Sequence, residues 1–355
     1  MNIMRRRQFI TPVLLLFASL SSCTPPPPAN IYQETVLSFG TIIDITIVGV
    51  DRTTADTAFS SLQDDFAYMQ VTWHAWRPGG LSRTNYLLSL GRNFSLVPSI
   101  QPLIEASTDL SAKSQGLFNP AIGKLIALWG FQSDEEPARP PRPDEVARLV
   151  ALNPEMSDIL YDGQMTIRSR NTAVQIDLGA FAKGFGIDMA IAHLQELGVK
   201  NAIINAGGDM RAIGNKNGKP WHIGIRNPIS SNASAVIASI DLRAGEAIVT
   251  SGDYERYFEY EGKRYHHIID PRTGYPARGT RSVTVIHSSA AVADAAATAL
   301  FVAGPGQWHE IARSMDIKFV MLIDENNRIH MNPAMARRMK LTASPEPKII
   351  LSEPL

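Results

Sequence analysis

The chain has 355 residues, of which 45% are hydrophobic and 19% charged, and its formal net charge is zero. This length and composition are those of a globular protein with one large domain or two smaller ones. No surplus of cations is available to neutralise phosphates, which argues against a nucleic-acid partner.

The N-terminus has the pattern of a bacterial export signal. Three arginines at 5–7 precede an apolar run over 13–20, which is too short for a membrane-spanning helix. Cys23 is the only cysteine, so it cannot form an internal disulfide. It ends "LSSC", which resembles the lipobox of bacterial lipoproteins. We therefore predict a signal peptide over 1–22 and an acylated Cys23.

Residues 23–30 would then form the lipid-anchored cysteine and its proline-rich tether, "TPPPPAN", which holds the folded part away from the bilayer. The expected location is a bacterial membrane, facing the periplasm or the outer cell surface. A signal peptide cut nearby, with an incidental thiol, is the alternative. Export through the general or the twin-arginine route stays open.

Strand-like and helix-like segments alternate beyond the tether. The β-branched run 41–48 predicts a strand, and apolar residues recur at helical spacing over 59–69 and 100–110. The charged, proline-rich run 134–145 is typical of a surface loop. Further along, five strands of one sheet are expected at 202–205, 221–226, 235–240, 247–251 and 282–286.

Two helices interrupt these strands, at about 179–197 and 292–303. Gly198 and Gly304 are expected to end them, and Pro305 strengthens the second stop. The pattern predicts an α/β or α+β domain over about 31–345, followed by a C-terminal tail over 346–355.

Polar clusters stand out from this background. "DLGAFAKGFGID" (177–188) opens a helix and carries Lys183, which suits a phosphate site, although an ordinary acid-capped helix with an exposed lysine fits equally. "NAGGDMRAIG" (205–214) has paired glycines that permit a close ligand approach or a tight hairpin turn.

The stretch 250–279 is dense in titratable groups and turn residues, and "EYEGKRY" within it predicts a hairpin. Two adjacent histidines there cannot both face one side of a strand. In "AVADAAATAL" (291–300), Asp294 and Thr298 lie one helical turn apart on one face. They are hard oxygen donors that suit Mg²⁺. A dipole partner and a back-bonded hydroxyl are the alternative roles.

Together the motifs resemble the ApbE family of bacterial flavin transferases. "DLGAFAKGFGID", "NAGGD", "SGDYER", "HHIIDPRTGYPA" and "ADAAATALFVAG" occur in that family's order, over about 38–304. The resemblance implies one large domain with mixed and antiparallel sheets and a T-fold-like core. It implies an enzyme that uses Mg²⁺ and FAD, moves FMN onto a threonine hydroxyl of a partner protein and releases AMP. The acceptors would be membrane or periplasmic redox subunits.

The resemblance also assigns residues to roles. Asp294, Thr298 and the carbonyl of Ala180 would bind the metal. His267 would be a general base, with Asp270 orienting it or acting as the base instead. The residues expected to contact the flavin nucleotide are Phe39, Trp76, Leu117, Phe118, Asn119, Asp177, Lys183 and Ile268.

The chain departs from the family pattern at two positions. Asn119 stands where the family usually has aspartate, which retains hydrogen bonding but loses charge. Phe39 replaces a usual methionine, and its larger ring would stack on the adenine or narrow its pocket. Two competing functions share the motifs: an FAD pyrophosphatase that gives FMN and AMP, and a non-catalytic periplasmic flavin-binding protein.

Overall fold

The computed structural model describes residues 29–355, except 134, 136, 138, 163–164, 231, 233 and 343–346. The expected signal peptide, Cys23 and most of the tether therefore lie outside the described residues. Within the described part, no helix is both long and apolar enough to cross a bilayer.

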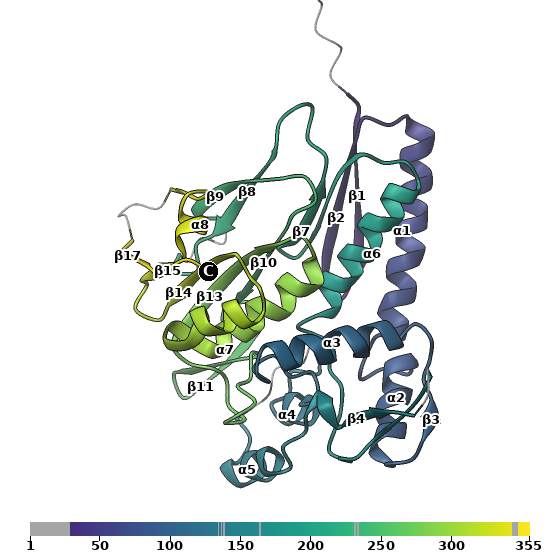
Figure 1. Ribbon diagram of the computed structural model, residues 1–355, viewed down its shortest axis with the longest axis vertical. Helices are drawn as coiled ribbons and strands as arrows, with labels where there is room; N and C mark the ends of the chain where they lie inside the picture. The colour runs from purple at the N-terminus through teal and green to yellow at the C-terminus, as the bar shows by residue number, and fades with distance from the viewer. Residues whose placement is uncertain are drawn as a thin grey trace, which may run out of the picture.

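A nine-stranded sheet forms the centre of the molecule (Figure 1), in the order β1-β2-β6-β7-β10-β13-β14-β15-β17. Neighbours are antiparallel except β15 and β17, which run parallel. β2 has the bounds predicted from its β-branched run, and its alternate isoleucines are fully buried. The strands are β1 (Ile31–Ser38), β2 (Thr41–Val48), β6 (Asn201–Ala206), β7 (Asp209–Ile213), β10 (Ala247–Gly252), β13 (Thr280–His287), β14 (Phe319–Asp324), β15 (Ile329–Met331) and β17 (Ile349–Leu351).

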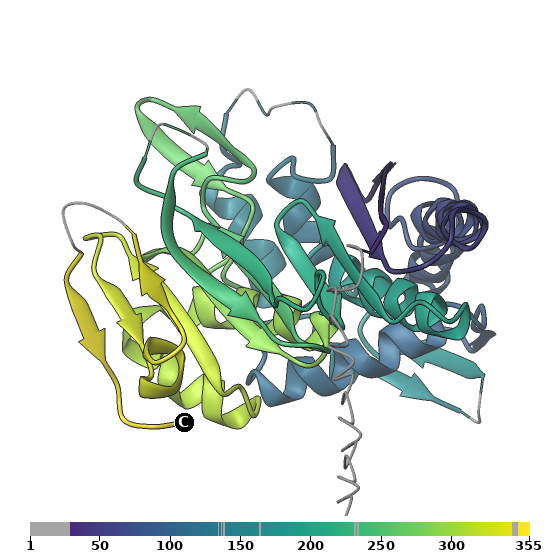
Figure 2. The same cartoon turned by 90° about the horizontal axis from the view of Figure 1, so that it is seen from above.

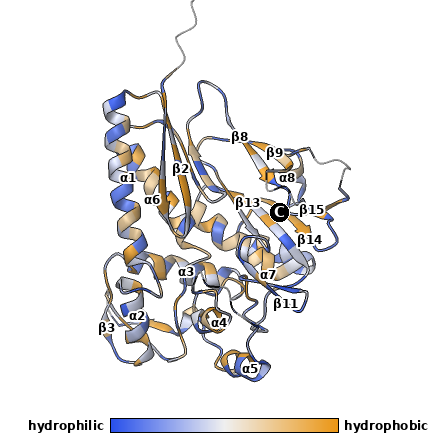
Figure 3. Ribbon diagram, turned by 180° about the vertical axis from the view of Figure 1, so that it is seen from behind, coloured by the Kyte–Doolittle hydropathy of each residue, from blue (hydrophilic) through white to orange (hydrophobic). Residues whose placement is uncertain are grey.

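Helices α6 and α7 cover one face of this sheet, with α1 and α3 packed beside them (Figures 1 and 2). They enclose the largest hydrophobic core. In Figure 3, α1 carries hydrophilic patches along its length, whereas β2 is mainly hydrophobic. The bounds of these helices are α1 (Arg52–Thr72), α3 (Gln101–Lys113), α6 (Ala182–Glu196) and α7 (Ala290–Ser314).

A second, smaller sheet packs on the opposite face and encloses its own core. Its order is β16-β9-β8, from β8 (Trp221–Arg226), β9 (Val236–Leu242) and β16 (Lys340–Leu341). The prediction that all five later strands share one sheet is therefore wrong. Alternating burial identifies a strand and its inward face, but the partner strand is decided by long-range pairing.

The remaining elements are short, and most of them lie in the lower part of Figure 1, whereas α8 lies near β9. They include a hairpin with Glu261 and Gly262 at its tip, both at positive φ, as the "EYEGKRY" run predicts. They are α2 (Gly80–Ser89), β3 (Phe94–Ser95), α4 (Gly123–Leu128), α5 (Pro143–Ala151), η1 (Met156–Asp158), β4 (Ile159–Tyr161), β5 (Thr166–Ser169), β11 (Tyr257–Tyr260), β12 (Lys263–His266) and α8 (Pro333–Ala336).

Three predicted boundaries differ from the structure. The loop expected over 134–145 ends earlier, because α5 begins at Pro143, a residue suited to a first helical turn. α7 does not end at Gly304, which instead forms a kink at φ 66° before Pro305 starts the helix again. The expected tail over 346–355 contains β17, which pairs with β15.

Candidate active site

The first turns of α6 and α7 meet the start of β7 and place three charged side chains together. Lys183 Nζ lies 2.6 Å from Asp209 Oδ2. The backbone N–H of Gly184 donates to Asp294 Oδ2 over 3.1 Å. The helices can approach this closely because Gly184 has no Cβ: one built there would lie 2.3 Å from the carbonyl oxygen of Ala290. Glycine at this position thus brings the lysine and the buried carboxylate to one place.

Asp294 is only 2% exposed and is surrounded along α7 by buried alanines. One helical turn later, Thr298 Oγ1 lies 3.4 Å from Ser251 Oγ of β10. Neither contact is the dipole cap or the back-bond of the alternative interpretation, because Ser289 caps the helix and the threonine hydroxyl contacts another strand. The helix therefore delivers two hard oxygen donors to the same side of the core.

The charged groups around Lys183 shift one another's pKa values. Burial lowers the pKa of Lys183, but Asp209, Asp294 and Glu255 outweigh it and raise that pKa overall. Burial raises the pKa of Asp294 to about 6, against the opposing effect of Lys183. Glu255 is exposed as a whole residue, yet burial around its carboxyl group raises the pKa of that group to about 7. Three acidic side chains thus surround one protonated lysine. Their combined negative charge would also favour the binding of a second cation.

Among the residues with described positions, no group of three or more His, Cys, Asp or Glu side chains is arranged to hold a metal ion. A cation bound beside Asp294 would therefore take its remaining ligands from hydroxyl and carbonyl oxygens, from water or from the substrate. Ala180 lies in the tight turn before α6, where Ala182 N–H donates to the carbonyl of Leu178. This turn is close in sequence to Gly184, which contacts Asp294.

Trp76 and Asp177 are joined directly. Trp76 Nε1–H donates to Asp177 Oδ2 over 2.8 Å, and the backbone N–H of Gly179 donates to Asp177 Oδ1 over 2.8 Å. Both side chains are half-buried. Asp177 lies shortly before Lys183 in the sequence, so this bond places the Trp76 ring beside the segment that leads into α6.

Phe39 occupies a tight turn at φ 53° between β1 and β2. Its ring stacks on Trp73 at 6.0 Å between centroids and meets Phe66 edge-on at 6.2 Å. A Cβ at Gly186 of α6 would lie 3.0 Å from this ring. Phe39 therefore packs against the helix that carries Lys183, and its position is held by an aromatic cluster.

Three of the expected flavin contacts, Leu117, Phe118 and Asn119, make their contacts within the fold. Leu117 and Phe118 are buried in the main core, 5% and 2% exposed. Asn119 donates to the Pro154 carbonyl over 2.9 Å and accepts from Ala121 N–H over 3.0 Å, so its amide is used within the fold. No charge is needed for either contact, which accounts for an asparagine here.

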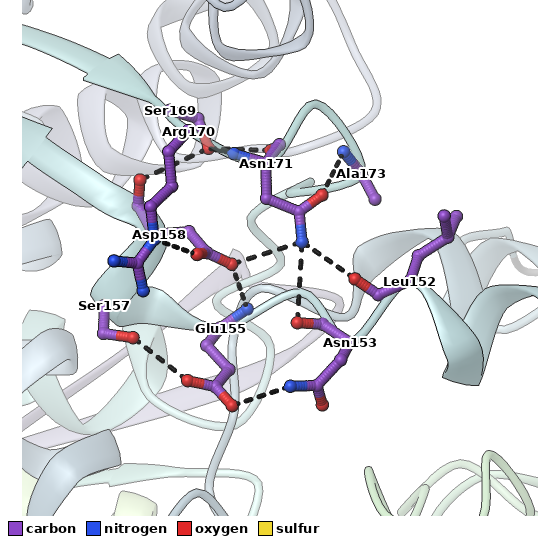
Figure 4. A network of polar contacts seen from close by, with 9 residues as sticks. All are labelled: Leu152, Asn153, Glu155, Ser157, Asp158, Ser169, Arg170, Asn171 and Ala173. Atoms are coloured by element: carbon purple, nitrogen blue, oxygen red, sulfur yellow. Dashed lines mark hydrogen bonds and ion pairs between the residues drawn. The ribbon is translucent and has the colours of Figure 1, made fainter.

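The loop that Asn119 holds is itself fixed by a polar network (Figure 4). Asp158 accepts from the Glu155 N–H at 3.0 Å and from Arg170 Nε at 2.6 Å. Asn171 donates to the Leu152 carbonyl and to Asp158. A cavity of about 380 Å³ lies on this side, and Lys183, His267 and Asp294 do not line it.

The two adjacent histidines have different environments. His266 is buried: Nε2–H donates to the Ala277 carbonyl over 2.8 Å, and Nδ1 accepts from Ile268 N–H over 3.3 Å. His267 is half-buried, and its Nδ1–H donates to the Arg256 carbonyl over 3.1 Å. Its Nε2 has no partner among the described residues. Because a carbonyl can only accept, this bond fixes the tautomer that leaves Nε2 free to accept a proton.

We expect His266 to make the fold sensitive to acid. Burial lowers its folded pKa from 6.5 to about 4, so the unfolded chain binds a proton at higher pH than the folded chain does. The free energy of unfolding should therefore fall as pH drops from 6.5 to 4, by on the order of 3 kcal/mol from this group. Chemical denaturation across that range measures the slope. His266→Gln should show a shallower slope, and an unchanged slope would contradict the assignment.

Asp270 is not paired with His267. Both of its carboxylate oxygens accept from the Arg272 side chain, with a shortest distance of 2.8 Å to Nη2. Arg272 also donates to the Val302 carbonyl of α7. Ile268 is buried and donates its N–H to His266. Asp270 thus helps to hold its loop against α7. It makes no contact with His267, whose Nε2 stays without a partner among the described residues.

Sequence reasoning missed Asp209 and left Glu255 unassigned. Asp209 follows the paired glycines of "NAGGD", so its signal was present, but spacing alone does not reveal a pairing with Lys183. Asp188 was also overlooked: it ends the motif that contains Lys183 and receives four contacts from Arg211 and from the start of α7.

Comparison with known proteins finds sequences similar to this chain. Two relatives named FAD:protein FMN transferase match the chain: one from Rhodobacter capsulatus, 40% identical over 92% of this chain, and one from Haemophilus influenzae, 31% identical over 75% of it. The chain spans 61% of the length of the first relative and 78% of the second.

Solved structures agree in fold. The ApbE protein from Thermotoga maritima superposes with a TM-score of 0.80 at 31% identity, covering 88% of this chain and all of that one. The flavin transferase ApbE from Vibrio cholerae gives 0.76 at 27% identity, again covering 88% of this chain and all of that one. A model of the ApbE family matches residues 39–321. The chain therefore belongs to the ApbE family.

Proposed function

We propose that this chain transfers FMN from FAD to a threonine hydroxyl of a partner protein, in a Mg²⁺-dependent reaction that releases AMP. The observation that carries the proposal is the contact set at the start of α6 and α7, where Lys183, Asp209 and Asp294 meet. The names of the curated relatives, FAD:protein FMN transferase, support the reaction class.

The donor set fits magnesium. Asp294 offers a carboxylate, Thr298 a hydroxyl and Ala180 a carbonyl, all of them hard oxygen donors. One protein carboxylate is enough for an ion that normally keeps waters and substrate phosphate oxygens in its shell. When bound, Mg²⁺ would neutralise charge on the pyrophosphate as the bond between the two phosphates breaks.

The chain's own residues would do the rest. Lys183, held protonated by Asp209, would offer a point charge to a phosphate at the start of α6, where the positive end of the helix dipole also favours an anion. Trp76 and Asp177, which are joined by a hydrogen bond, would contact the flavin nucleotide, as would Phe39, which packs against α6. The other residues expected to contact the flavin nucleotide would support its site from the surrounding core: Leu117, Phe118, Asn119 and Ile268.

His267 is proposed as the general base. The threonine oxygen forms a bond to the FMN phosphorus, the bond from that phosphorus to the AMP oxygen breaks, and AMP leaves with the electron pair. The hydroxyl proton goes to His267 Nε2, which the bond from Nδ1 to the Arg256 carbonyl leaves free. Burial lowers the pKa of His267 to about 3, so the imidazole is unprotonated at neutral pH.

We expect His267→Ala to lower kcat for flavin transfer by about 100-fold, the usual contribution of a positioned proton acceptor. Binding of FAD should persist, because His267 is assigned to the proton and not to the nucleotide. Flavin fluorescence measures binding, and covalent flavin on the acceptor measures turnover. His222→Ala, at an exposed histidine on β8, is the matched control. Loss of FAD binding in the His267 variant alone would contradict the assignment.

Incubation with FAD, Mg²⁺ and a threonine-bearing acceptor tests the function as a whole. Covalent flavin on the acceptor, with AMP released in equal amount, supports transfer. Free FMN without labelled acceptor would mean that water takes the place of the threonine and that the chain is a pyrophosphatase. Binding of FAD without either product would mean a flavin-binding protein.

We further propose that the chain is exported and anchored by lipid on Cys23, so that it meets acceptors at a bacterial membrane. The support is the sequence pattern over 1–30. Cys23→Ser should move the protein from the membrane fraction to the soluble fraction on cell lysis, and an unchanged distribution would overturn the anchor.

A further inference from the structure

Asp188, in the second turn of α6, receives contacts from two other elements, the first of which is the start of α7. Its Oδ1 accepts from the backbone N–H of Ala290 over 2.8 Å, and its Oδ2 from that of Ala291 over 3.1 Å. The hydroxyl of Ser289, the N-cap of α7, donates to Oδ2 over 2.6 Å. One carboxylate thus takes up the first free N–H groups of α7, where negative charge also suits the helix dipole.

The second element is β7. Arg211 Nη1 lies 2.6 Å from Asp188 Oδ1, and both side chains are largely shielded, 21% and 18% exposed. Two residues earlier on β7, Asp209 pairs with Lys183. Two ion pairs therefore join α6 to β7. The helix supplies the cation of one pair, Lys183, and the carboxylate of the other, Asp188. The Asp188 carboxylate also holds the start of α7.

A helix behaves as a stiff rod over one turn, so anchoring its first residues also fixes the position of the next turn. Asp294 lies about one turn beyond Ala290, and Gly184, one turn before Asp188, donates to it. Asp188 and Gly184 thus hold α7 against α6 at two successive points. The distance from Lys183 to Asp294 is set by this pair of contacts.

We propose that Asp188 is a positioning residue that fixes Asp294, and with it the metal-binding face of α7, relative to Lys183. This inference rests on the proposed function, because it concerns the place of a ligand for Mg²⁺. Asp188 itself touches neither the metal nor the substrate; it acts through α7.

Asp188→Asn tests this role with little change in shape. An amide nitrogen now replaces one oxygen, so one of the N–H groups of α7 faces a donor, and the pairing with Arg211 is lost. We expect the Mg²⁺ concentration for half-maximal turnover to rise at least about ten-fold, the usual cost of disturbing a group that orients a metal ligand. The KM for the acceptor protein should change little.

Asp65→Asn is the matched control. Asp65 of α1 contacts the His193 imidazole near the other end of α6, so this variant also removes a carboxylate contact of that helix, but leaves α7 untouched. Its Mg²⁺ requirement should equal that of the wild type. If both variants shift this requirement equally, Asp188 is a general stabiliser of α6 and the positioning role is overturned.

A second measurement does not depend on activity. In Asp188→Asn, hydrogen exchange of a peptide covering the first turn of α7 should accelerate, while peptides of α1 stay unchanged. Should Asp188→Asn not fold, Arg211→Gln, which keeps the carboxylate and removes its cation, should shift the Mg²⁺ requirement in the same direction by a smaller factor. No shift in that variant, with intact hydrogen exchange, would overturn the inference.

The outcomes separate the two proposals. A wild type that transfers flavin with Mg²⁺ dependence, beside an Asp188→Asn variant with unchanged Mg²⁺ requirement, overturns the positioning role alone. A wild type whose activity does not depend on Mg²⁺ overturns both.

Discussion

Replacing Asp294 by asparagine is expected to abolish Mg²⁺-dependent flavin transfer while leaving the chain folded. The amide keeps the shape and can still accept from Gly184 N–H, but it removes the carboxylate proposed as metal ligand. Turnover at saturating FAD should fall by at least about 100-fold. Covalent flavin formation over a Mg²⁺ titration is the measurement.

Stability should move the other way. Burial raises the pKa of Asp294 to about 6, so the folded chain at neutral pH carries a carboxylate in an environment that disfavours its charge. The uncharged amide of the Asp294→Asn variant has no such cost, and the melting temperature should hold or rise. Glu310→Gln, at an exposed position of the same helix, is the control for the chemistry of the change. Full activity in Asp294→Asn would overturn the metal assignment.

Gly184→Ala is expected to cause a large loss of stability together with loss of activity. The new Cβ would stand 2.3 Å from the carbonyl oxygen of Ala290, 2.6 Å from its carbonyl carbon and 2.8 Å from Ala291 N, all backbone atoms of α7. No side-chain rotation relieves such a contact, so the helices must separate. We expect a decrease in the free energy of unfolding of roughly 3 kcal/mol, measured by chemical denaturation.

Gly306→Ala is the matched control on α7. A Cβ at Gly306 meets nothing within 4 Å, and its φ is not in the left-handed region. Alanine favours a helix over glycine, so this variant should be neutral or more stable. A Gly184→Ala protein with wild-type stability and turnover would show that the contact between α6 and α7 tolerates separation, and would remove the argument that it sets the site.

Much of the local structure could be predicted from the sequence. The β-branched run at 41–48 forms β2 with the predicted bounds, and the Glu-Gly pair at 261–262 forms the predicted hairpin tip. Helical spacing at 59–69 lies within α1. These features depend on periodicity and turn chemistry, which neighbouring residues decide among themselves.

Other features depend on pairing between distant segments and could not be read this way. β8 and β9 have the same alternation as β10 and β13, yet they form another sheet. Gly304 and Pro305 would end an isolated helix, but buried residues beyond them continue α7 after a kink. The family resemblance suggested Asp270 as a partner for His267, but in the structure Asp270 pairs with Arg272.

The sequence by itself determined the family, the order of its motifs and the helical spacing that places Asp294 and Thr298 on one face. It did so because these signals are local or lie in a fixed order along the chain. The tertiary structure decided that Lys183 pairs with Asp209, that Gly184 touches Asp294 and that Asp188 anchors α7. Those contacts join segments that meet only when α6, α7 and β7 pack together, and a charge or a hydrogen bond acts only over the few ångströms that such packing creates.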